Sequence, residues 1–145
     1  AQAHDAQERF RGFREALFHA GLPLNEDLVV DGQYTQQAGY DGTKYLIGLD
    51  RPPTAIMTSN DDAALGAMSA LREAHLRIPE DMALCGFDDI PSAAFTVPPL
   101  TTVHIPVREL GKQSVELLEA AIDRGLTPGE VSIKLPLDLR LRGST

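Results

Sequence analysis

The sequence predicts an α/β fold in which helices flank a Rossmann-like, mostly parallel sheet. Short apolar runs alternate with stretches of helical periodicity along most of the chain, and two of these runs end in polar residues. Residues 55–60 read AIMTSN, and residues 82–89 read MALCGFDD. Apolar runs of this length, separated by a helical pattern, are typical of buried parallel strands. Ligands of open α/β sheets bind at the carboxyl ends of the strands, so these polar endings predict a ligand site.

The first part of the chain is predicted to alternate helices and strands. Aromatic and leucine residues at helical spacing predict a helix over residues 5–20, which Gly21 ends. The β-branched run at 28–31 predicts a strand. Residues 35–46 are expected to be helical, although Gly39 and Gly42 weaken that prediction.

Two more strands are expected over residues 55–59 and 82–87. The segment between them has an apolar helical face and begins after Asp61 or Asp62, either of which can cap a helix. Alternation of this kind, with room for right-handed crossovers, is the pattern of a doubly wound sheet.

After Asp89 the pattern changes. Residues 90–100 contain three prolines and predict an irregular connection, followed by a strand over 101–105. Pro106 suits the first turn of a helix that is expected to end near Gly125. Two alternating segments then predict strands over 132–135 and 138–141.

Composition restricts the function. The chain has 145 residues, enough for one domain with a core, and a formal net charge of −8. Such acidity argues against direct contact with nucleic-acid phosphates. The single cysteine, Cys85, cannot form an internal disulfide and favours a cytoplasmic setting. No apolar run is long enough to span a membrane.

The first predicted helix has no strand before it in this sequence. A parallel sheet needs helices on both faces, each connected to a strand. We therefore expect the chain to be part of a longer protein with at least one more strand upstream.

Four residues at the predicted ligand edge are candidates for binding: Arg9, Tyr34, Asn60 and Asp88. Arginine offers a planar set of donors for hydroxyls or a carboxylate. Three of these candidates also have a purely structural interpretation: a solvated helix face for Arg9, a surface turn for Tyr34 and a helix cap for Asn60. Because adjacent strand residues point to opposite faces, Asp88 and Asp89 are not expected to act together as a catalytic pair.

Enzyme chemistry, metals and cofactors have little support. The four histidines are scattered and show no metal-ligand spacing. The sequence contains no glycine-rich nucleotide motif and no nucleophile elbow. We therefore expect a protein that is not an enzyme and needs no cofactor.

Several motifs in order resemble the effector-binding core of the lactose/galactose-repressor family of bacterial transcription regulators. They are AQERFRGF at 6–13, NDDAALG at 60–66, RIPED at 77–81, GFDD at 86–89 and PPLTTV at 98–103. The resemblance implies a periplasmic-binding-protein-like fold of two lobes with the ligand between them. It places residues 1–104 and 137–145 in the C-terminal lobe, and residues 105–136 in the N-terminal lobe.

The same resemblance implies roles for individual residues. Arg9, Asn60 and Asp88 match hydrogen-bonding positions, and Tyr34 matches a position where an aromatic ring stacks on the ligand. Leu65, Met68 and Phe95 match a dimer surface, although core packing is an equal possibility for the first two. The partners implied are a small-molecule effector of the sugar class, a second copy of the chain, and operator DNA through a helix-turn-helix module absent from this sequence. A periplasmic sugar-binding protein of a transport system is the alternative, because it shares the fold, and a glycoside-cleaving enzyme is a third reading.

Overall fold

One four-stranded sheet organises the computed structural model, which describes residues 4–127 and 132–145. The strands lie in the order β1 (Ala55–Met57), β2 (Ala83–Asp88), β3 (Thr101–His104) and β4 (Asp138–Arg140). The first three run parallel, and β4 pairs antiparallel with β3. The predicted α/β fold with a parallel sheet is confirmed, with one antiparallel strand at its edge.

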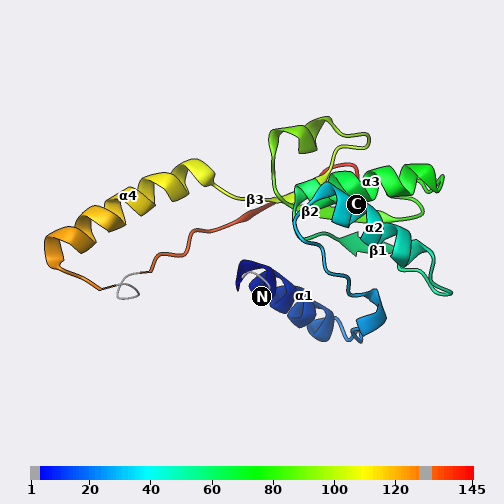
Figure 1. Ribbon diagram of the computed structural model, residues 1–145, viewed down its shortest axis with the longest axis horizontal. Helices are drawn as coiled ribbons and strands as arrows, with labels where there is room; N and C mark the ends of the chain where they lie inside the picture. Colours follow the sequence, from blue (N-terminus) through cyan, green and yellow to red (C-terminus); the bar gives the residue numbers. More distant parts are fainter. Residues whose placement is uncertain (1–3, 128–131) are drawn as a thin grey trace.

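Two helices pack together beside the sheet, α2 (Gln36–Ile47) and α3 (Asp61–Glu73) (Figure 1). Their backbones approach so closely that a Cβ atom added at Gly39 would overlap the backbone of Ala63. A Cβ atom added at Gly66 would overlap the backbone of Gln36 in the same way. Gly39, one of the two glycines that weakened the helix prediction for residues 35–46, therefore allows α2 and α3 to pack in contact.

The core lies between this helix pair and the strands. Its fully buried members include Leu71 from α3, Leu84 from β2 and Leu100 from the segment before β3. Ser144 is also fully buried and donates a hydrogen bond from Oγ to the Leu84 carbonyl at 2.7 Å. The residues after β4 therefore contribute to the same core.

Helix α4 (Val107–Arg124) extends away from the sheet (Figure 1). The chain leaves the sheet through β3, runs out along α4 and returns to β4. No residue of α4 is buried. Five of its large apolar residues are between 47 and 71% exposed: Val107, Leu110, Val115, Leu118 and Ile122. Across the described residues, no helix is both long and apolar enough to cross a bilayer.

The remaining elements are α1 (His4–His19) and two 3₁₀ turns, η1 (Glu26–Leu28) and η2 (Pro91–Phe95). Helix α1 lies apart from α2 and α3 (Figure 1). It reaches the sheet mainly through one side chain, which belongs to the candidate site.

Two predicted strands are wrong. Residues 28–31 form the end of η1 and an extended stretch that joins no sheet, because Asn25 caps a 3₁₀ turn here and accepts a hydrogen bond from the Asp27 N–H. Val29 and Val30 remain 40% and 38% exposed. Residues 132–135 are also not a strand, since nothing in the described part of the chain pairs with them.

Candidate functional site

Arg9 lies at the centre of the predicted site. Its Nη1 atom donates a hydrogen bond to the Ser59 carbonyl at 2.5 Å. Its guanidinium carbon lies 4.0 Å from the centre of the Phe87 ring and 5.6 Å from that of the Tyr34 ring, within range of cation–π attraction. Its Nη2 atom is 3.7 Å from Oδ1 of Asp88. One side chain thus connects α1 to the carboxyl ends of β1 and β2 and to the turn before α2.

Asp5 is a member of this cluster that sequence reasoning missed. Its Oδ2 atom accepts a hydrogen bond from the Tyr34 hydroxyl at 3.1 Å and lies 3.3 Å from Nη2 of Arg9. Burial alone would raise the pKa of Asp5, but these hydrogen bonds and the charge of Arg9 outweigh it and lower that pKa. Burial and the bond to Asp5 raise the pKa of Tyr34. The spacing of four residues before Arg9 on one helix face was the available signal.

Asn60 acts as the N-cap of α3. Its Oδ1 atom accepts a hydrogen bond from the Ala63 N–H at 2.9 Å, and its Nδ2 atom donates to the Tyr34 carbonyl at 3.3 Å. The structural interpretation of Asn60 is therefore correct, and the side chain also fixes the turn that carries Tyr34.

Asp88 and Asp89 point to different partners, as the sequence indicated. Asp88 faces Arg9, whereas Asp89 makes an ion pair with Arg142 and a hydrogen bond with His104 on the far side of the turn. Burial raises the pKa of Asp88, while Arg9 opposes that effect. Both residues have positive φ angles, 114° and 57°. Conformations of this kind cost about 1–3 kcal/mol each and persist only where the surroundings hold them.

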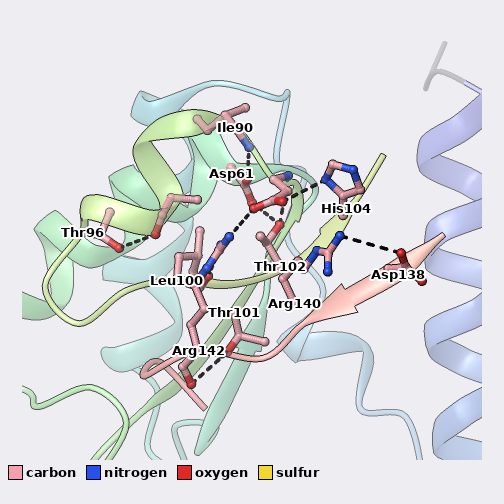
Figure 2. A network of polar contacts seen from close by, with 12 residues as sticks. Asp61, Ile90, Thr96, Leu100, Thr101, Thr102, His104, Asp138, Arg140 and Arg142 are labelled. Atoms are coloured by element: carbon pink, nitrogen blue, oxygen red, sulfur yellow. Dashed lines mark hydrogen bonds and ion pairs between the residues drawn. The ribbon is translucent and has the colours of Figure 1, made fainter. Parts of the chain in front are cut away.

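The side chain of Asp61 anchors the turn that follows β2. Its side chain is fully buried and accepts hydrogen bonds from the Thr102 hydroxyl at 2.6 Å and from the Ile90 N–H at 2.9 Å (Figure 2). Burial without a cationic partner raises the pKa of Asp61. Gly86 makes room for it, since an added Cβ there would overlap the carboxylate. Sequence reasoning considered Asp61 only as a helix cap.

A groove of about 630 Å³ begins at Asp88 and runs along the start of α4. Its lining comes from the turn after β2 and from the segment that leaves β3, including His104, Ile105 and Arg108. Arg9 and Tyr34 lie outside that groove, so Asp88 is the point where the cluster and the groove meet. The described residues contain no group of three side chains suited to holding a metal ion.

The residues predicted for a dimer surface differ in exposure. Phe95 is 85% exposed, and Val97 beside it is 95% exposed. Leu65 and Met68 on α3 are partly buried, and Met68 packs against the core. An exposed apolar pair of this size is suited to an interface.

Comparison with known proteins decides the family. The family model described as a periplasmic binding protein-like domain matches residues 1–145. The chain belongs to this family. The resemblance to the effector-binding core of lactose/galactose-repressor regulators is also confirmed, because the related proteins are regulators of that family.

Two relatives show the extent of the likeness. The transcriptional repressor PurR of Vibrio cholerae serotype O1 (strain M66-2) is 44% identical over 112 residues, which cover 77% of this chain and 33% of the repressor. The transcriptional regulator AscG of Escherichia coli K12 is 40% identical over 118 residues, covering 81% and 35%. The chain therefore spans about a third of the length of these relatives.

Similarity to solved structures of regulators supports the same family assignment. A LacI-family regulatory protein from Chloroflexus aggregans is 41% identical, with a TM-score of 0.85 over 95% of this chain and 50% of that protein. The transcriptional regulator CelR in complex with cellobiose is 33% identical, with a TM-score of 0.88 over 95% of this chain and 42% of that protein. These relatives are regulators rather than components of transport systems.

Proposed function

We propose that this chain senses a small effector for a bacterial transcription repressor, and that the effector is an uncharged polyhydroxylated molecule such as a sugar. The observation that carries the proposal is the convergence of Arg9, Tyr34 and Asp88 at one edge of the sheet. The cellobiose bound to the regulator CelR supports the ligand class by similarity.

The charges at the edge favour a neutral ligand over a phosphate or a carboxylate. The charges that act on Asp88 include one cation, Arg9, and three carboxylates: Asp5, Asp61 and Asp62. Two nitrogens of the Arg9 guanidinium already face protein oxygens, and the Phe87 ring lies against it. An anion placed against Asp88 would be repelled by that carboxylate and its acidic neighbours, whereas sugar hydroxyls can donate hydrogen bonds to the Asp88 oxygens.

Tyr34 complements these polar groups. Its hydroxyl is held by Asp5, so the ring is fixed at the same edge as Asp88. A fixed aromatic ring offers a flat apolar surface at small cost in side-chain entropy. Carboxylate acceptors beside an aromatic face suit the hydroxyl edges and C–H face of a sugar ring.

A thermal-shift comparison tests this site. The full-length protein is mixed with D-glucose, D-ribose, cellobiose or glucose 6-phosphate, since a ligand that binds the native state raises its melting temperature. We expect a shift with a neutral sugar and a smaller one with the phosphate. Arg9→Ala and Asp88→Ala should abolish the shift, whereas the matched control Arg11→Ala, an exposed residue of the same helix, should keep it. A larger shift with the phosphate would contradict the proposed ligand class.

The regulatory step is a change in operator affinity when the effector binds. Allosteric coupling between two sites of a protein is typically about 1–3 kcal/mol, or roughly 5–150-fold in affinity. Operator DNA would be contacted by a helix-turn-helix module outside this chain. We expect no catalytic turnover of sugars, because Asp88 and Asp89 do not face one substrate.

The same proposal includes a division of the chain into two lobes and a dimer interface. Residues 105–136 would belong to the N-terminal lobe, which would cover the exposed apolar face of α4, while 1–104 and 137–145 form the C-terminal lobe. Leu65, Met68 and Phe95 would lie at a homodimer interface. Phe95→Asp should then convert a dimer to a monomer in analytical ultracentrifugation without changing the effector-induced thermal shift, and an unchanged dimer would refute that interface.

A further inference from the structure

Asp89 joins the two strands that carry the chain out to α4 and back. Its Oδ2 atom lies 2.9 Å from Nδ1 of His104, the last residue of β3. Its Oδ1 atom accepts a hydrogen bond from Nη2 of Arg142, two residues after β4, at 2.6 Å. His104 and Arg142, both labelled in Figure 2, come from β3 and from the residues just after β4, and these two strands pair side by side. One carboxylate therefore holds both connections between the sheet and the segment beyond it.

The contacts of Asp89 are built into the fold. Its side chain is only 13% exposed, and that of Arg142 is 21% exposed. Arg142 also donates from Nη1 to the Leu100 carbonyl at 2.8 Å, and the Asp89 N–H lies 3.3 Å from the Thr102 hydroxyl oxygen. Burial would raise the pKa of Asp89, but its bonds to Arg142 and His104 outweigh burial and lower it. Charge-assisted pairs of this geometry are among the stronger hydrogen bonds in proteins.

Asp89 is also the neighbour of the proposed ligand contact. Asp88 and Asp89 share one peptide bond, and both have positive φ angles. Asp61 holds the next residue, Ile90, through its N–H. Because the turn is fixed on that side, a shift of the backbone at Asp88 on ligand binding would move Asp89 more readily than the residues after Ile90.

We propose that Asp89 is a positioning residue that couples effector binding at Asp88 to the direction in which β3 and β4 leave the sheet. This inference rests on the proposed sensing function and adds the element that transmits the signal. Asp89 need not touch the effector. Its contacts stabilise one arrangement of the segments that leave the sheet after β3 and return to it at β4. An effector that shifts the turn after β2 would change the relative stability of that arrangement.

The first experiment measures amide hydrogen exchange in the full-length protein without ligand. Asp89→Asn keeps the size of the side chain but removes its charge, and we expect at least tenfold faster exchange in β3 and β4 with little change in β1. The matched control is Asp81→Asn, which breaks the Arg77–Asp81 pair of 2.7 Å in the loop between α3 and β2. That control should leave exchange in β3 and β4 unchanged. Equal acceleration by both variants, or none by Asp89→Asn, would overturn the inference.

The second experiment separates ligand affinity from response. Operator affinity is measured with and without saturating D-glucose, D-ribose or cellobiose, using a DNA fragment selected from a random library with the wild-type protein. Asp89→Asn should bind the sugar within threefold of wild type, yet reduce the sugar-induced change in operator affinity at least tenfold. Arg9→Ala should instead lose sugar binding.

The outcomes separate the two proposals. If no sugar changes operator binding by the wild-type protein, the proposed function fails, and this inference fails with it. If the wild type responds and Asp89→Asn responds equally, the sensing function stands and the role of Asp89 is refuted. If Asp89→Asn loses sugar affinity while the response at saturation is unchanged, Asp89 is a binding residue and the coupling role is wrong.

Discussion

The helix pair α2–α3 and the helix α4 come from one chain but pack in opposite ways. Where α2 meets α3, glycines bring two backbones into contact, and Leu71 of α3 is fully buried. In α4, no residue is buried, although its apolar residues recur at helical spacing. A helix with such a stripe is stabilised mainly by the surface that covers it. Burial thus separates the part of the chain that packs on itself from the part whose partner is not among the described residues.

The largest contrast is expected from truncating a core leucine. Leu71 on α3 is fully buried in the core cluster. Leu71→Ala should lower the free energy of unfolding by about 2–5 kcal/mol, because it removes buried methyl groups and leaves a cavity. Urea denaturation of the 145-residue chain measures this loss. A loss below about 1 kcal/mol would mean that α3 is not a core helix.

A matched pair of glycines gives the next largest effect. Gly66→Ala should destabilise the chain by about 1–3 kcal/mol, because its methyl group overlaps the backbone of Gln36. Gly111 lies inside α4 with nothing within 4 Å of an added Cβ. Gly111→Ala should therefore be neutral or stabilise by roughly 0.5–1 kcal/mol, through helix propensity alone. Thermal unfolding followed by circular dichroism compares the two, and effects of the same sign would break the contrast.

Acid titration tests whether a surface ion pair, Arg77–Asp81, stabilises the part of the chain that packs on itself. The hydrogen bonds from Arg77 lower the pKa of Asp81 from 3.8 to about 2. A carboxyl whose pKa is lower in the folded state stabilises the fold above the unfolded value and loses that contribution as the pH falls. The melting temperature of wild type should exceed that of Asp81→Asn at pH 6, and the difference should shrink as the pH falls from about 4 through 2. A difference that stays the same between pH 6 and pH 2 would assign the effect to something other than ionisation.

The smallest effect is expected on α4. Leu118 is 61% exposed, so Leu118→Ala should change the free energy of unfolding of the 145-residue chain by less than about 0.5 kcal/mol. In a longer protein in which a second lobe covers α4, the same change should cost more, because the side chain would then be buried. Chemical denaturation of both proteins sharpens the contrast, and equal losses in both would refute the proposed cover.

Sequence patterns predicted what depends on local chemistry. The cap at Asn60, the alternation of strands and helices, and the divergence of Asp88 from Asp89 all follow from neighbouring residues and strand geometry. The strand expected at 28–31 failed because β-branched residues form a strand only beside a partner, and here a capped 3₁₀ turn competes. Strand pairing at 132–135 failed for the same lack of a partner in the described residues.

Part of the candidate site could likewise be predicted from local sequence, and part could not. Arg9, Tyr34 and Asp88 were found because strand ends and a helix start predict a common edge. Asp89 and Arg142 are 53 residues apart in the sequence, and their ion pair depends on the antiparallel return of β4 beside β3. No local pattern specifies that return. The ligand-binding roles of the four predicted residues stay predictions until an effector is bound.

The position of Ser144 has a consequence for how the molecule is made. Its backbone carbonyl accepts from the Leu84 N–H at 2.8 Å, and its hydroxyl oxygen accepts from the Thr101 N–H at 2.8 Å. During synthesis, β2 and β3 are translated before Ser144, so the N–H groups of Leu84 and Thr101 lack these acceptors until the residues after β4 have been added. The hydrogen bonding of these two strands is therefore complete only after the chain has passed through α4 and returned to the sheet.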